Sequence, residues 1–112
     1  MKRYKLVILE PAHQDLITIK DYIANDLFSP MAAVNMLRTF RSAIRSLLTM
    51  PKKHPIIEDA YLYDRQYHKL PVKNYIIFYT VDDNPKPPIV YIERILYARR
   101  DWTNILQLPP KG

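Results

Sequence analysis

The sequence predicts an α+β domain in which an N-terminal strand and a two-helix hairpin precede a three-stranded antiparallel meander, forming one sheet packed by the helices. Residues 67–97 hold runs rich in β-branched and aromatic side chains, separated by turn-forming residues, which is typical of strands. Upstream, Pro11 and Pro30 each open a stretch in which apolar residues recur at helical spacing. A chain of 112 residues suffices for one hydrophobic core, so we expect a single domain over residues 1–112.

The first strand and the first helix are predicted from residues 3–27. Residues 3–9 alternate as a strand does, and Pro11 then stands in the first turn of a helix, where proline is tolerated. We expect this helix to end near Asp26 or Leu27. Its apolar face should contain Ala12, Leu16, Ile19, Ile23 and Leu27, and its opposite, polar face should contain Asp15, Lys20, Asp21 and Asn25.

The second helix begins at Ser29-Pro30, an N-cap serine followed by proline at the first helical position, and Pro51 stops it. Arg38, Arg41 and Arg45 fall on one line beside its apolar face, and a solvated surface is the favoured interpretation of that line. Residues 51–66 combine prolines with mixed charge and should form a loop containing at most one helical turn. The apolar face is expected to contain Ala33, Leu37, Phe40, Ile44, Leu47 and Leu48.

The last three strands are expected at residues 67–72, 74–81 and 89–97, with a turn at residues 82–88. Their apolar runs are nearly continuous rather than alternating, which indicates that both faces of the middle of the sheet are covered. The first strand has to join this sheet after the two-helix excursion. We expect it at the edge, beside the second or the last strand.

Composition limits the classes of function. The net charge of +6, from 17 Lys and Arg against 11 Asp and Glu, favours a partner with a negative surface, such as nucleic acid or an acidic protein, over a charge that only maintains solubility. No run of apolar residues is long enough for a transmembrane helix, and no signal peptide is evident, so we expect a cytoplasmic protein. The chain has no cysteine, its one glycine is the last residue, and its three histidines lack metal-ligand spacing. We therefore expect no metal site and no cofactor.

Basic and aromatic side chains concentrate near the predicted sheet. Such a mixture can hold phosphates and stack on bases, or it can cleave RNA without a metal, through a base, an acid and a cation that stabilises the phosphorane. Tyr75, Phe78 and Tyr91 are more readily explained as core aromatics. The full group is Tyr67, His68, Lys69, Lys73, Tyr75, Arg94, Tyr97, Arg99, Arg100 and Trp102.

The order of the predicted strands and helices and the amino-acid sequence of residues 67–79 and 94–102 resemble the RelE/ParE superfamily of bacterial type II toxins. The resemblance runs from Tyr4 to about Leu106. Its specific parts are the Ser29-Pro30 helix start, Asn74-Tyr75 and Arg100-Asp101-Trp102. The resemblance implies a small basic toxin that is neutralised by an antitoxin encoded beside it, and a toxin–antitoxin pair that represses its own operon. Operator DNA would then be bound only through the antitoxin complex. The antitoxin should lay an apolar segment over the helical hairpin or along an exposed sheet edge.

Two activities compete within this superfamily. RelE-like members cleave mRNA on the ribosome, whereas ParE-like members inhibit DNA gyrase. The ribonucleases carry an arginine where this chain has Ile76, and isoleucine cannot support a phosphate. They also carry lysines on the preceding strand, where this chain keeps Lys69 but has Tyr67 two positions earlier. The motif Lys-Leu-Pro-Val-x-Asn-Tyr and the Arg-Asp-Trp sequence at the end of the last predicted strand resemble the ParE-like branch. Gyrase inhibition is therefore the favoured interpretation.

Candidate site residues follow from both interpretations. For the ribonuclease, Tyr97, Arg100 and Lys69 would be catalytic, because Arg100 matches the family's terminal arginine and Tyr97 stands where some members use histidine. His68 and the Lys52–His54 loop could assist them. A decayed toxin that only binds its antitoxin is a third possibility. The residues expected to contact the target are His68, Lys73, Arg94, Arg99 and Trp102.

Overall fold

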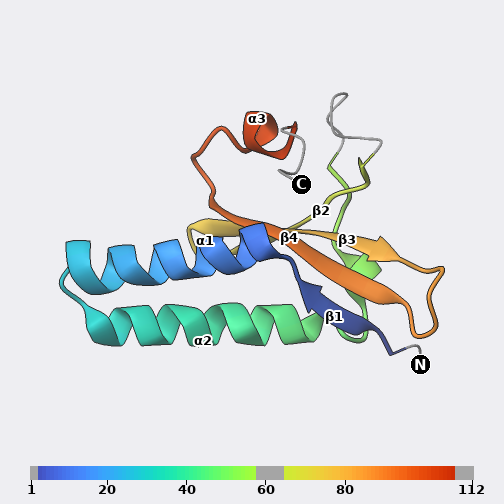
Figure 1. The fold of residues 1–112 in the computed structure, drawn as a ribbon, viewed down its shortest axis with the longest axis horizontal. Helices are drawn as coiled ribbons and strands as arrows, with labels where there is room; N and C mark the ends of the chain where they lie inside the picture. The colour runs from blue at the N-terminus through green and yellow to red at the C-terminus, as the bar shows by residue number, and fades with distance from the viewer. Residues whose placement is uncertain (1–2, 58–64, 108–112) are drawn as a thin grey trace.

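The computed structural model describes residues 3–57 and 65–107 and confirms the predicted order of strand, helical hairpin and meander (Figure 1). The loop residues 58–64 lie outside the described residues. The strands are β1 (Lys5–Ile8), β2 (His68–Val72), β3 (Tyr75–Asp82) and β4 (Ile89–Tyr97). The helices are α1 (Glu10–Asp21), the π-helical turn η1 (Tyr22–Asp26), α2 (Pro30–Ser46), the 3₁₀ turn η2 (Pro51–Lys53) and α3 (Trp102–Gln107).

The strands form one sheet in the order β1-β4-β3-β2. The meander β2–β3–β4 is antiparallel, as predicted, and β1 lies at the edge, parallel to β4. The expectation that the first strand joins beside the last one is thereby confirmed. The register of β3 and β4 shifts between Phe78 and Tyr79, a bulge that increases the local twist.

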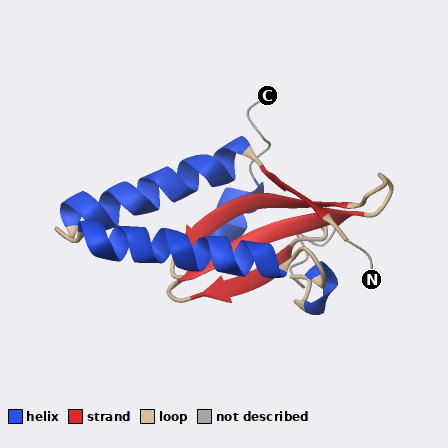
Figure 2. Ribbon diagram, turned by 90° about the horizontal axis from the view of Figure 1, so that it is seen from below, coloured by secondary structure: helices blue, strands red, loops and turns tan. Residues whose placement is uncertain are grey.

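The hairpin of α1 and α2 covers one face of the sheet (Figure 2). Each helix starts with proline at its first or second position, and each directs its apolar face at the strands. Phe40 meets the ring of Tyr75 edge-on at 5.5 Å between centroids, and Tyr79 donates its buried hydroxyl to the carbonyl of Pro51. The fully or nearly buried residues of this core are Ala12, Ile19, Ile23, Ala33, Phe40, Ile44, Leu47, Val72, Ile77, Tyr79, Val90, Ile92 and Ile95.

A smaller apolar cluster covers the opposite, outer face, where α3 lies (Figure 1). Its presence confirms that both faces of the central strands are covered. Alternation along β3 sends Ile77 and Tyr79 to the hairpin face and Ile76 and Phe78 to the outer face. The buried members of the cluster are Ile57, Tyr67, Ile76, Phe78, Leu96 and Leu106.

Two expectations for the first helix are wrong. Asp15, expected on the polar side, turns toward β4 with its side chain only 12% exposed. Leu27, expected on the apolar face, is 54% exposed. The reason for the second difference is the π-helical turn, in which the Leu27 N–H bonds to the carbonyl of Tyr22. This wider turn breaks the 3.6-residue repeat that would have brought Leu27 over the core.

Candidate functional site

Four of the predicted site residues gather where the β2–β3 turn meets the end of β4. The N–H of Ala98 donates to the carbonyl of Asn74 at 2.8 Å, which ties the two segments together. Lys73 occupies the turn with φ of 56°, and Arg99 and Arg100 follow β4 directly. All three of these cations are exposed. We call Lys73, Tyr97, Arg99 and Arg100 the sheet-end cluster.

Two members of this cluster, Tyr97 and Arg100, also line a hollow of about 520 Å³ between the hairpin and the ends of β3 and β4. The rings of Tyr75 and Tyr97 lie 5.8 Å apart. Burial, followed by the proximity of Tyr22 and Tyr97, raises the pKa of Tyr75, so its phenol stays protonated and cannot serve as a base near neutral pH. The remaining lining residues are Asp15, Thr18, Ile19, Tyr22, Leu27, Asn74, Ile95 and Leu96.

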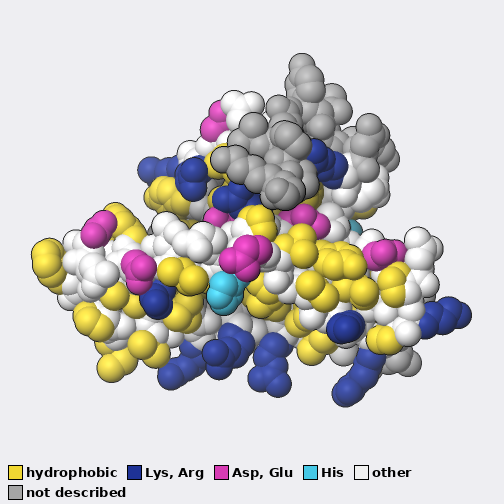
Figure 3. Space-filling model, in the orientation of Figure 1, with side chains coloured by type: hydrophobic (Ala, Val, Ile, Leu, Met, Phe, Trp, Pro, Cys, Tyr) yellow, Lys and Arg dark blue, Asp and Glu magenta, His cyan; other side chains and the backbone are white. Residues whose placement is uncertain are grey.

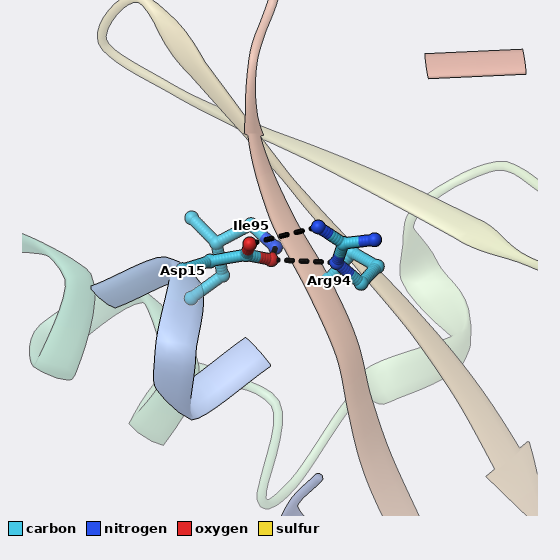
Figure 4. A network of polar contacts seen from close by, with 3 residues as sticks. All are labelled: Asp15, Arg94 and Ile95. Carbon is cyan, nitrogen blue, oxygen red and sulfur yellow. Dashed lines mark hydrogen bonds and ion pairs between the residues drawn. The ribbon is translucent and has the colours of Figure 1, made fainter. Parts of the chain in front are cut away.

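Asp15 closes one side of the hollow through a network that Figure 4 shows in detail. Its carboxylate accepts two hydrogen bonds from Arg94, at 2.8 and 2.9 Å, and a third from the backbone N–H of Ile95 at 2.9 Å. The paired β1 residues stop at Ile8, opposite Ile92, so the carboxylate satisfies a β4 amide beyond the end of β1. The hydrogen bond to Asp15 raises the pKa of Arg94. Arg94, predicted to contact the target, is therefore already held by a partner within the chain.

Lys69 and Trp102 lie together on the outer face. The Lys69 ammonium stands 5.8 Å from the centre of the Trp102 ring, within the range of a cation–π contact. The indole packs 5.4 Å from Phe78 between ring centroids. In the sheet, Lys69 of β2 lies opposite Phe78 of β3, and Tyr97 of β4 lies opposite Tyr75 of β3. Phe78 and Tyr75 are three positions apart on β3. An odd separation places the two side chains on opposite faces, so the structure does not bring Lys69 to Tyr97.

His68 is buried, with only 6% of its surface exposed. Its ring stacks on Tyr79 at 4.9 Å between centroids, and its Nδ1 lies 2.7 Å from the carbonyl of His54. Because a carbonyl only accepts, Nδ1 must carry the hydrogen. The hydrogen bond of His68 thus joins β2 to the loop that precedes it. The role of His68 in target contact stays a prediction.

The Lys52–His54 loop lies at the other end of β3, around a hollow of about 670 Å³ that Val81 also lines. Six strand steps separate Val81 from Tyr75, which corresponds to about 20 Å, so this loop is remote from Tyr97 and Arg100. Lys52 pairs with Asp83. Burial, then Lys53 and His68, lowers the pKa of His54.

The tip of the hairpin carries a second surface, which is apolar. Phe28 is 89% exposed and Met31 is 71% exposed. Phe28 has φ of 51°, in the left-handed region that usually takes glycine at the end of a helix. We call the group of Tyr22, Leu27, Phe28, Met31 and Val34 the hairpin-tip patch. Exposed apolar patches of this kind mark sites of protein–protein contact.

Comparison with known proteins identifies the family to which this chain belongs. The family model described as the ParE toxin of the type II toxin-antitoxin system, parDE, matches residues 6–102. The chain belongs to this ParE toxin family. Membership implies an antitoxin partner, as the type II toxin–antitoxin system requires.

A solved structure described as the chromosomal ParDE TA system from P. aeruginosa has the same fold as this ParE-family chain. The two superpose with a TM-score of 0.69 at 16% sequence identity, covering 88% of this chain and 100% of the other. At that identity the likeness concerns the fold alone. No curated protein sequence matches the chain.

The predicted site residues thus separate into four places. These are the sheet-end cluster, the Lys69–Trp102 pair on the outer face, Arg94 beside Asp15, and His68 beside Tyr79. Reasoning from sequence missed Asp15 and Tyr22, which line the hollow. No local signal marks either one, since their neighbours across the hollow are far away in the chain. Among residues 3–57 and 65–107, no three acidic or histidine side chains come together as a metal site would require. No helix in those ranges is both long and apolar enough to cross a membrane.

Proposed function

We propose that this ParE-family toxin arrests growth by binding DNA gyrase in the cytoplasm, without breaking any bond itself, and that a cognate antitoxin neutralises it. The observation that carries the proposal is the environment of Ile76. In the ribonucleases that the sequence resembles, an arginine stands at this position and supports the reacting phosphate. Here the side chain is 7% exposed and packs in the outer-face cluster with Phe78 and Leu96.

A cation at the position of Ile76 would be surrounded by apolar side chains, which is costly for a charge without a partner. The sheet also separates the other candidate catalytic groups. Tyr97 and Arg100 line the hollow on the hairpin side, and Lys69 lies over Trp102 on the outer face. A general acid and a general base need to reach the same phosphate. The separation therefore supports binding over RNA cleavage.

The sheet-end cluster provides a surface suited to such binding. Lys73, Arg99 and Arg100 are exposed beside the ring of Tyr97, which combines long-range attraction with an aromatic anchor. Arginine and aromatic residues are enriched where protein interfaces derive most of their affinity. We propose that this cluster contacts an acidic surface of gyrase, with the Lys69–Trp102 pair at its margin.

Brief induction of the chain in a host lacking the antitoxin tests the choice of target. Primer extension on abundant mRNAs and a reporter of the DNA-damage response are followed in the same culture. We expect DNA damage with intact mRNA. Ribosome-dependent cuts within reading frames would overturn the proposal and favour a catalytic role for Tyr97 and Arg100, the two candidates that share one hollow. Absence of growth arrest would favour a decayed toxin.

For the antitoxin we propose the hairpin-tip patch as the docking surface. The patch is apolar and exposed, and Phe28 holds an uncommon left-handed backbone without any covering contact in the described part of the chain. An apolar segment of the antitoxin placed here would bury Phe28 and Met31 together. Recognition of this kind resembles helix-in-groove binding, in which the apolar anchors of a helix supply affinity. Strand addition does not apply here, because the patch lies on the helical hairpin and not on a sheet edge.

Substitution of Phe28→Asp with Met31→Asp tests this surface. Aspartate accommodates a left-handed backbone more readily than phenylalanine, so the toxin should still fold. We expect co-purification with the antitoxin, encoded by the neighbouring reading frame, to be lost. The matched control is Gln14→Asp with Asn35→Asp, which adds two charges to exposed positions of the same helices and should leave pairing intact. Retained pairing in the tip variant would show that the surface is wrong.

A further inference from the structure

The exposed side of α2 is divided into two parts of different chemistry. Near its start, Met31 and Val34 are exposed apolar residues of the hairpin-tip patch. From there on, Arg38, Arg41 and Arg45 occupy the same line at steps of four, three and four residues from Val34, which is the spacing of one helical face. Figure 3 shows this division along its lower edge, where hydrophobic side chains gather at the left and Lys and Arg side chains project farther to the right.

Within residues 3–57 and 65–107, the three arginines form no ion pair that would balance their charge. No residue of α2 from Pro30 to Ser46 is acidic. The ion pairs and side-chain hydrogen bonds of the described residues do not involve Arg38, Arg41 or Arg45. The acidic residues of the hairpin lie instead on the first half: Glu10, Asp15, Asp21 and Asp26. The hairpin is therefore polarised, with an unpaired basic side on α2.

The neighbours of the arginines indicate what kind of partner fits. The other exposed residues on the last two-thirds of α2 are small and polar: Asn35, Ser42 and Ser46. After the helix, Thr49 is exposed and polar, and Met50 is an exposed apolar residue. Arginines in protein interfaces usually act beside buried apolar or aromatic anchors, and residues 36–46 of α2 expose no such side chain. Arginine together with Ser, Thr and Asn is instead the set of side chains that contacts phosphate oxygens.

The dimensions also fit a nucleic acid backbone. The seven helical steps from Arg38 to Arg45 span about 10 Å, which matches the rise of about three base pairs. The basic surface formed by these arginines continues beyond the end of α2. The N–H of Tyr4 donates to the carbonyl of Leu48 at 3.1 Å, which brings the exposed Arg3 and Lys5 next to the end of α2.

We propose that the arginine row of α2 binds the phosphate backbone of duplex DNA without sequence specificity. The row is separate from the sheet-end cluster, so this inference does not depend on gyrase being the target. The duplex could be DNA held by a target enzyme or operator DNA held by the antitoxin complex, since both present the same phosphates. In either case α2 would supply electrostatic affinity and orientation rather than sequence recognition.

The test measures binding of the purified chain to an unrelated 30-base-pair duplex over a range of salt concentrations, with no gyrase present. The variant is Arg41→Gln with Arg45→Gln, and the matched control is Lys20→Gln with Lys86→Gln, which removes the same charge elsewhere. We expect the variant to bind roughly tenfold to a hundredfold more weakly at about 0.1 M salt, and the slope of log affinity against log salt to decrease by about two. The control should retain most of the affinity and the slope.

Equal losses in both variants would overturn the proposal, because they would reflect net charge alone. Unchanged binding in the arginine variant would overturn it as well. Weakened pairing with the antitoxin at unchanged duplex binding would assign the row to an acidic protein segment instead. If the proposal holds, two further measurements distinguish the sources of DNA. Weaker inhibition of gyrase by the variant would indicate target DNA, and weaker operator binding by the toxin–antitoxin complex would indicate operator DNA.

Discussion

Among the residues that the structure describes, 3–57 and 65–107, the hairpin face and the outer face of the sheet are covered by very different amounts of chain. On the hairpin face two long helices bury thirteen residues in one cluster. On the outer face the six-residue helix α3 and the segment around Ile57 contribute to a cluster of only six buried residues. Of the candidate target-binding groups, Lys69 and Trp102 lie on this thinner outer face. Tyr97 and Arg100 of the sheet-end cluster instead line the hollow on the hairpin side.

This difference separates stability from recognition. Burial of apolar surface is the dominant favourable term in folding, so the hairpin face supplies most of the stability. A short helix is marginal by itself and depends on packing, which means that the outer face can change with a smaller loss. Binding residues can then be placed on it, or beside it, without loss of the fold.

The largest expected effect comes from truncating the hairpin face. Phe40 is 1% exposed and packs against Tyr75, so Phe40→Ala should lower the free energy of unfolding by about 3–5 kcal/mol. Leu106→Ala on the outer face should cost about 2 kcal/mol, the low end for a buried leucine, because α3 can shift to fill the space. Urea denaturation of both variants measures the two values. Equal losses would contradict the division between the faces.

A smaller effect is expected at the junction between α1 and β4. Asp15→Ala leaves the Arg94 guanidinium and the Ile95 N–H without their acceptor, and the loss should be about 2–3 kcal/mol, since the pair is only partly exposed. The matched control is Asp21→Ala, whose ion pair with Lys20 at 3.4 Å lies on the surface and should contribute below about 0.5 kcal/mol. Similar losses in both variants would mean that Asp15 does not hold the helix to the sheet.

The smallest effect concerns pH. Burial, with Lys53 and His68 nearby, lowers the pKa of His54 below its ordinary value of 6.5. The unfolded chain therefore takes up this proton at a higher pH than the folded chain does. The contribution of neutral His54 to the free energy of unfolding is fully present above pH 6.5. It is lost as the pH falls through the pKa of His54 in the folded chain. Thermal unfolding between pH 7.5 and 5 should show a weaker dependence on pH in His54→Gln than in the natural sequence. The same pH dependence of thermal unfolding in both proteins would show that His54 does not contribute to it.

The fold was largely predictable from sequence because its signals are local. Proline at the start of each helix and the apolar spacing of Phe40 and Ile44 suffice for the hairpin. The continuous apolar run of β3 predicted a sheet with both faces covered. The short helix α3 was not predicted. Asp101 precedes it as an N-cap residue type, but six residues give no usable periodicity.

The site was less predictable because it depends on contacts between distant segments. The pairing of Asp15 with Arg94 joins residues 79 positions apart. The helical periodicity of the apolar residues alone placed Asp15 on the wrong side of its helix. The resemblance to the ribonuclease members of the superfamily grouped Lys69 with Tyr97 and Arg100. The strand register, which no local pattern reveals, places Lys69 on the other face of the sheet.

The most direct test of the central claim is supercoiling by purified gyrase in the presence of the purified chain. The natural sequence should inhibit the reaction. Arg99→Gln with Arg100→Gln should weaken inhibition at least tenfold, because two exposed cations of the sheet-end cluster are removed. The control, Lys20→Gln with Lys86→Gln, should inhibit as the natural sequence does. Full gyrase activity at every concentration of the natural chain, with mRNA cleaved in a translation reaction, would contradict the account.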